Sequence, residues 1–275
     1  MTARLIISLL MLSVAILSCN KSVRDLDTDM TAVEDHLYAQ SAFVDVFRQV
    51  HRMAIEDSLL IEAGFATDLK DECLDTIYFT SAAQAVEKSL WLDWGQDSTR
   101  PNCEDDKLRY GLINVNINGF YPEDFSFMTI ELFNYKVEEY TISGLFEVTY
   151  LGKTNGQRQY NMVIKNGEIK SDRGTAFWSC DWYMLQIEGS DLPKPFDDVF
   201  KVEGLIEGRS SKGNAFTVVN NGELFFDMRC KYAYGDDQTL TPENLLSRFI
   251  NLNDDCDSRC SVTNLNGRWD VEIDY

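Results

Sequence analysis

The feature that most constrains the fold is an alternation of apolar and polar residues in the middle of the chain. Between residues 140 and 150, large apolar side chains alternate with polar ones, and the pattern returns at residues 160–164 and 224–234. Successive side chains of a β-strand point to opposite faces of a sheet, so a period of two is typical of a half-buried strand. The sequence therefore predicts a mainly β fold, with antiparallel meander or sandwich-like sheets.

Two stretches of the chain, residues 140–187 and 198–234, share the same order of strands and turns. GLFE at 144–147 is matched by GLIE at 204–207, and NGEI at 166–169 by NGEL at 221–224. An Asn-Gly pair between alternating runs predicts a hairpin turn in each. We expect two related meanders within a β-rich domain at residues 58–275. Residues 235–267 are polar and are expected to be irregular, with a last strand after them. Parallel β-α-β units are not expected, because helical patterns do not alternate with the strands.

One helix is expected before the strands, at residues 31–57. Thr31 and Glu34 fit a capping box, in which each side chain bonds an amide of the first turn. Apolar residues then recur at helical spacing on one face, while Asp45 and Arg48 fall on the other. We expect this amphipathic helix to pack on or cap a sheet. The apolar stripe consists of Ala39, Phe43, Val46, Phe47, Val50 and Ala54.

The N-terminus has the form of an export signal. Arg4 precedes an apolar run at residues 5–17, which is too short to span a bilayer as a helix. The ending Ser18-Cys19 resembles the lipobox of bacterial lipoproteins. That resemblance implies cleavage after residue 18 and acylation of Cys19, so residues 1–18 would be a signal peptide. The alternative is an ordinary secretory signal that happens to end beside a cysteine.

Residues 19–30 are polar and are expected to form a flexible tether between the lipid and the folded domain. Asp25, Asp27 and Asp29 imitate the start of a calcium-binding loop. However, Met30 stands where that loop needs glycine, and His36 stands where it needs a bidentate glutamate. A solvated tether is therefore favoured over a calcium site.

The net charge of −20 limits the partners that the chain can bind. Nucleic acid is excluded, because its phosphates need lysine and arginine. Electrostatic adhesion to anionic lipid is equally disfavoured, so the membrane would be held through the N-terminal lipid alone.

Six cysteines follow Cys19. An even number in an exported chain indicates disulfides, although the sequence does not choose among the pairings. Residues 256 and 260 form the closest pair; for them a disulfide is favoured over zinc, because no histidine lies nearby in sequence. The disulfide candidates are Cys73, Cys103, Cys180, Cys230, Cys256 and Cys260.

No catalytic, cofactor-binding or metal-binding residue is predicted. His36 and His51 lie on the expected helix without a nucleophile motif, and we interpret them as surface residues. A Gly-rich phosphate loop is absent from the sequence. Paired carboxylates remain open as a chemistry; Asp93 and Asp274 are flanked by aromatic residues, but outward-facing strand positions are favoured for both.

The aromatic cluster Trp178, Trp182 and Tyr183 could stack on sugar rings if it were exposed. We favour a place in the core, because large aromatic side chains dominate burial in β proteins.

Several stretches together resemble a group of Bacteroidetes-type exported lipoproteins of unassigned function. The resemblance covers most of residues 19–234 and brings no activity with it. It implies that Cys73 and Cys103 form a disulfide bracketing a strand. The chain departs from the group at Cys180 and around Cys256 and Cys260. The resemblance rests on Ser18-Cys19, residues 42–47, Cys73 with residues 91–95 and Cys103, and residues 133–137, 166–169 and 197–204.

Two hypotheses of function follow. The first is a non-catalytic, lipid-anchored protein of the cell envelope, expected at the outer membrane on its periplasmic or surface face, that binds an envelope protein or a glycan or serves a structural role. The alternative is an envelope polysaccharide hydrolase that uses paired carboxylates. The first is preferred, because the sequence carries no catalytic motif and no cofactor is indicated.

Overall fold

The computed structural model describes residues 26–56, 76–80, 87–96, 105, 107–119, 121–123, 125–189, 197–253 and 256–273. The expected signal peptide, Cys19, Cys73, Cys103 and Asp274 lie outside the described residues. Within them the chain forms one helix, α2 (Thr31–Glu56), followed by strands. The mainly β fold with an N-terminal helix is therefore confirmed.

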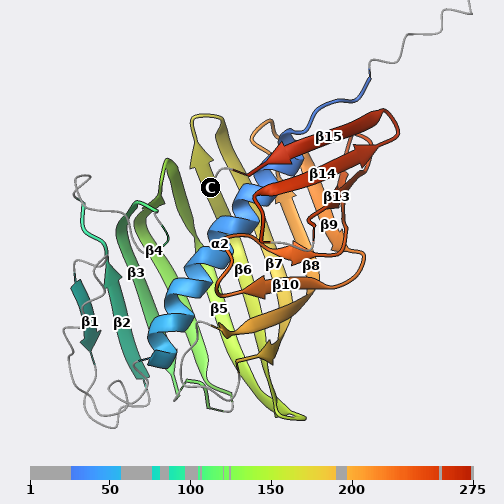
Figure 1. Cartoon of the computed structure of the whole chain (residues 1–275). Coiled ribbons are helices and arrows are strands. Elements are labelled where there is room, and N and C mark those ends of the chain that lie inside the picture. The colour runs from blue at the N-terminus through green and yellow to red at the C-terminus, as the bar shows by residue number, and fades with distance from the viewer. Residues whose placement is uncertain are drawn as a thin grey trace, which may run out of the picture.

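The strands follow one another through the chain (Figure 1). They are β1 (Thr76–Thr80), β2 (Glu87–Asp93), β3 (Arg109–Asn118), β4 (Phe127–Val137), β5 (Tyr140–Thr154), β6 (Gln157–Ser171), β7 (Gly174–Glu188), β8 (Val199–Arg209), β9 (Ala215–Asn220), β10 (Leu224–Asp227), β11 (Tyr234–Gly235), β12 (Gln238–Pro242), β13 (Arg248–Asn251), β14 (Arg259–Asn264) and β15 (Gly267–Glu272).

The strands form one antiparallel meander. Each strand from β1 to β9 pairs with the next, and β12 to β15 continue the sheet, while β10 and β11 form a side ladder on β8. Figure 1 shows the sheet curving around α2. Residues 235–267, expected to be irregular, contain β12, β13 and β14. Their strands are short, so too few alternating positions stand in a row to give a clear pattern.

The helix is buried on nearly all sides rather than along one stripe. Apart from Thr31, Glu34, Tyr38, Arg48 and Arg52, its described side chains are buried. The curved sheet therefore encloses α2, and the polar residues of the helix have to find partners in the interior.

Asn166-Gly167 is not the hairpin turn that the sequence predicted. Strand β6 continues through these two residues and forms a bulge against β7, where Asn166 adopts a positive φ of 51°. A Cβ on Gly167 would lie 2.6 Å from Cζ of Phe43, so glycine lets the helix approach the sheet. Asn221-Gly222 likewise joins β9 to β10, which do not pair; both lie against β8.

The core holds the tryptophans that could have been exposed. Trp178 and Trp182 are buried and contact each other edge to face, which confirms their place in the core. Tyr183, the third member of the aromatic cluster, is 37% exposed, so the prediction is wrong for that residue: it lies on the opposite face of β7. One disulfide joins Cys230 to Cys256, so Cys256 does not pair with its near neighbour Cys260. Cys180 and Cys260 are free, buried thiols.

Candidate functional site

Both histidines are fully buried, so their interpretation as surface residues is wrong. Nε1–H of Trp178 donates to Nδ1 of His36 (3.2 Å), which leaves the proton on Nε2 to donate to Oε1 of Gln238 (3.1 Å). The amide of Gln238 donates in turn to Gln40 and Asn220. Burial lowers the pKa of His36 to about 4, so the ring is neutral at pH 7.

His51 joins α2 to the other side of the interior. Its Nε2 lies 2.9 Å from Oδ2 of Asp198, and its Nδ1 lies 2.6 Å from the hydroxyl of Tyr121. Burial lowers the pKa of His51, so a neutral ring donates to the carboxylate and accepts from the phenol. This chain has the order of an acid-base relay, but all three side chains are buried. We interpret these three residues as a structural hydrogen-bond network in the interior.

A buried ion pair holds the middle of the helix. Arg109 on β3 donates to both carboxylate oxygens of Asp45, at 2.8 and 3.3 Å, and also binds Asp105. Burial alone would raise the pKa of Asp45, but the positive charges of Arg109, Lys107 and Arg48 together outweigh it and hold that pKa below its usual range. Replacing Asp45 would leave Arg109 with Asp105 as its remaining carboxylate partner.

The segment before the helix is bound to the last strands. Asp27 accepts hydrogen bonds from the buried guanidinium of Arg248, at 2.5 and 2.7 Å, and Asp29 pairs with Lys212. The described end of the expected tether, residues 26–30, is therefore held on the domain. Its two aspartates bind basic side chains, and Asp29 also accepts a hydrogen bond from the hydroxyl of Thr31 at the start of the helix.

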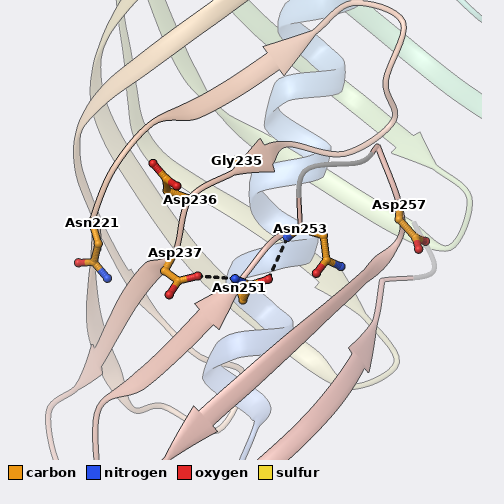
Figure 2. Close-up of a pocket in the computed structure, with 7 residues that line it drawn as sticks. All are labelled: Asn221, Gly235, Asp236, Asp237, Asn251, Asn253 and Asp257. Carbon is orange, nitrogen blue, oxygen red and sulfur yellow. Dashed lines mark hydrogen bonds between the residues drawn. The ribbon is translucent and has the colours of Figure 1, made fainter.

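An open cleft of about 820 Å³ lies where the turns after β9, β11 and β13 meet. Figure 2 shows Asp237, Asn251 and Asn253 next to one another, with Asn221, Asp236 and Asp257 around them. The lining is polar, with carboxamides and carboxylates, and no basic side chain is among its described residues. It consists of Asn221, Gly235, Asp236, Asp237, Asn251, Asn253 and Asp257.

Hydrogen bonds between neighbours fix these side chains (Figure 2). Nδ2 of Asn251 donates to Oδ1 of Asp237 (2.6 Å), while Oδ1 of Asn251 accepts from the backbone of Asn253 (3.3 Å). The other carboxylates hold turns: Asp236 accepts from the amide of Glu223 and Asp257 from that of Arg259. The cleft thus presents oriented carboxylate oxygens and amide groups that can accept and donate hydrogen bonds.

The acids of the cleft are not arranged for the chemistries that carboxylates can support. Among the described residues, no three His, Cys, Asp or Glu side chains are placed to hold a metal ion. Asp236, Asp237 and Asp257 are exposed, whereas a general acid needs a shielded site that raises its pKa. Asp93 lies elsewhere, where it accepts from the amide of Gly95. The cleft is suited to binding rather than to proton transfer.

No family model, no curated protein and no solved structure matches the chain. The resemblance to exported lipoproteins therefore stays a prediction. Within the described part of the chain, no helix has the length and apolar character needed to cross a membrane.

Proposed function

We propose that the chain is a lipid-anchored protein of the cell envelope that binds, without catalysis, a neutral hydroxyl-rich ligand such as a glycan. The observation that carries the proposal is the cleft lined by three asparagines and three aspartates. The anchor is proposed from the sequence, where Cys19 directly follows a signal-like apolar run. The expected location is the outer membrane, on its periplasmic or surface face.

The cleft favours hydroxyl groups over other ligand chemistries. A hydroxyl both donates and accepts, and here carboxylate oxygens can accept from it while carboxamides can do either. Phosphate or sulfate would meet three carboxylates and no lining cation, so anionic ligands are disfavoured. An apolar ligand would leave the polar lining desolvated and unpaired.

The hydrolase alternative gains no support from the described residues. It needs two facing carboxyls of which one is shielded, yet the cleft acids are exposed. Buried acids in the interior bind basic groups instead: Asp45 binds Arg109, Asp198 binds His51 and Asp227 binds Arg229.

Calorimetric titration with neutral oligosaccharides from envelope polysaccharides tests the binding proposal. Asp237→Ala should weaken binding about tenfold or more, because a hydrogen bond to a charged group contributes roughly 1.5–3 kcal/mol. Asp172→Ala, at an exposed turn between β6 and β7, is the matched control and should bind like the parent. The proposal fails if no neutral glycan binds, or if both variants bind equally well.

The anchor has a separate test. The intact mass of protein purified from membranes should correspond to a chain that begins at Cys19 and carries acyl groups. A Cys19→Ser chain should be released from the membrane fraction. An unmodified Cys19 in the membrane-bound protein would refute the anchor without bearing on the cleft.

A further inference from the structure

We propose that one end of the molecule rests on the lipid surface, with Leu265 and Leu26 in contact with the bilayer and the cleft held at the opposite end. We call this end the anchor end and define it by residues 26–30, the turn between β12 and β13, and the turn between β14 and β15. The inference rests on the lipid anchor of the proposed function.

Three segments meet at the anchor end around Asp27. Its carboxylate accepts from the backbone amide of Leu246, in the turn between β12 and β13. Its carbonyl accepts from the side chains of Asn264 and Asn266, which flank Leu265 in the turn between β14 and β15. The point where the chain leaves toward Cys19 is therefore fixed beside this turn.

The leucines of this end are unusually open to solvent. Leu265 is 90% exposed and Leu26 is 69% exposed. The turn around Leu265 carries no charge, since its neighbours are Asn264, Asn266 and Gly267. An exposed leucine on an uncharged tip can enter the interfacial layer of a bilayer without desolvating an ion.

The length of the connecting chain decides which end can reach the membrane. Seven residue steps separate Cys19 from Leu26, which span at most about 25 Å when fully extended. Phe125 is also widely exposed, at 76%, but it binds the backbone of Tyr150 at the far end of β5. The ten residues from Tyr140 to Tyr150 alone span about 34 Å along that strand. A connecting chain of this length does not let the molecule stand on the end that carries Phe125 with Cys19 still at the lipid surface.

This orientation places the cleft away from the lipid. The cleft lies near the start of β14, where Asn251 pairs with Ser261, and the anchor end lies at its other terminus, where Asn264 pairs with Gly267. Strand β14 spans about 17 Å between these ends. A ligand in the cleft would therefore approach from the solvent side rather than from the bilayer.

Tryptophan substitution and quenching by brominated lipid test the orientation. The lipidated chain is reconstituted in phosphatidylethanolamine–phosphatidylglycerol vesicles as the variants Leu265→Trp, Leu205→Trp and Phe125→Trp. Leu205 is 48% exposed on β8, between the two ends, so it serves as the matched control. We expect the added emission to be largely lost at position 265 and retained at positions 205 and 125. Retained emission at 265, or equal quenching at all three positions, overturns the inference.

A second experiment tests the orientation independently of whether Cys19 is acylated. The same variants are attached to nickel-chelating lipid through a polyhistidine tag that replaces residues 1–19. If intact mass shows no acylation, the anchor proposal falls, but the tagged protein still reports which end faces the bilayer. Selective quenching at position 265 would support the orientation, and its absence would refute it.

Discussion

Acidification should destabilise the folded protein through His36 before its carboxylates titrate. Burial lowers the pKa of this histidine from 6.5 to about 4. Below pH 6.5 the unfolded chain therefore binds a proton at His36, whereas the folded chain binds this proton only when the pH approaches 4. The contribution of neutral His36 to stability is complete above pH 6.5 and is lost as the pH falls toward 4.

The magnitude follows from the difference in bound protons. One proton bound only by the unfolded chain changes the free energy of unfolding by about 1.4 kcal/mol per pH unit. Between pH 7.5 and pH 5.0 the loss is therefore about 2 kcal/mol, nearly all of it below pH 6.5. The folded ring has no solvent contact to weaken this effect, because His36 is 0% exposed.

Urea unfolding, followed by the fluorescence of the buried tryptophans, measures the effect at each pH. His51 titrates in the same direction, so the quantity to compare is the difference in stability between wild type and His36→Gln. We expect that difference to shrink by about 2 kcal/mol from pH 7.5 to pH 5.0. Phe216→Leu removes a ring packed on His36 without removing a titrating group, and its curve should run parallel to wild type. Parallel curves for wild type and His36→Gln would refute the reasoning.

Three further predictions concern the interior. Asp45→Asn should cost about 1.5–3 kcal/mol, because it removes the more deeply buried of the two carboxylates that bind Arg109, whereas Glu147→Gln at an exposed pair should cost less than about 1 kcal/mol; urea unfolding compares them. Cys230→Ser should cost about 3 kcal/mol, since its bond to Cys256 closes a loop of 26 residues, and a denaturation midpoint unchanged from wild type under oxidising conditions would contradict this. The two free thiols should resist iodoacetamide in the folded protein and react in urea, as peptide mass mapping would show, because burial raises the pKa of both.

Local periodicity predicted the parts of the fold that depend on neighbours in sequence. The helix expected at residues 31–57 is observed at Thr31–Glu56, because its apolar spacing lies within the segment. The predicted capping box is wrong, since the hydroxyl of Thr31 donates to Asp29 and the carboxylate of Glu34 pairs with Arg173. The alternation at residues 140–150 lies within β5 for the same reason. Burial of Trp178 and Trp182 was expected from the size of their side chains, which dominate burial in β proteins.

Features that depend on distant partners could not be predicted in this way. An Asn-Gly pair supplies a positive φ to a hairpin or to a bulge, and here β6 pairs with β7 on both sides of Asn166, which makes it a bulge. His36 is buried because Gln238, 202 positions later, offers it a partner. The cleft was missed since its residues are ordinary turn formers until β9, β12 and β13 pair.

The enclosed helix has a consequence for the order in which the protein can be completed. It is the first described element of the chain, yet its lasting partners include Gln238, and the segment before it binds Asn264, 237 positions away. In a nascent chain, the polar groups that bind these late partners would stay unpaired until the last strands had been made. Contacts between residues so far apart in the sequence form slowly. The native packing of the helix therefore cannot be complete before the chain has been made as far as Asn264.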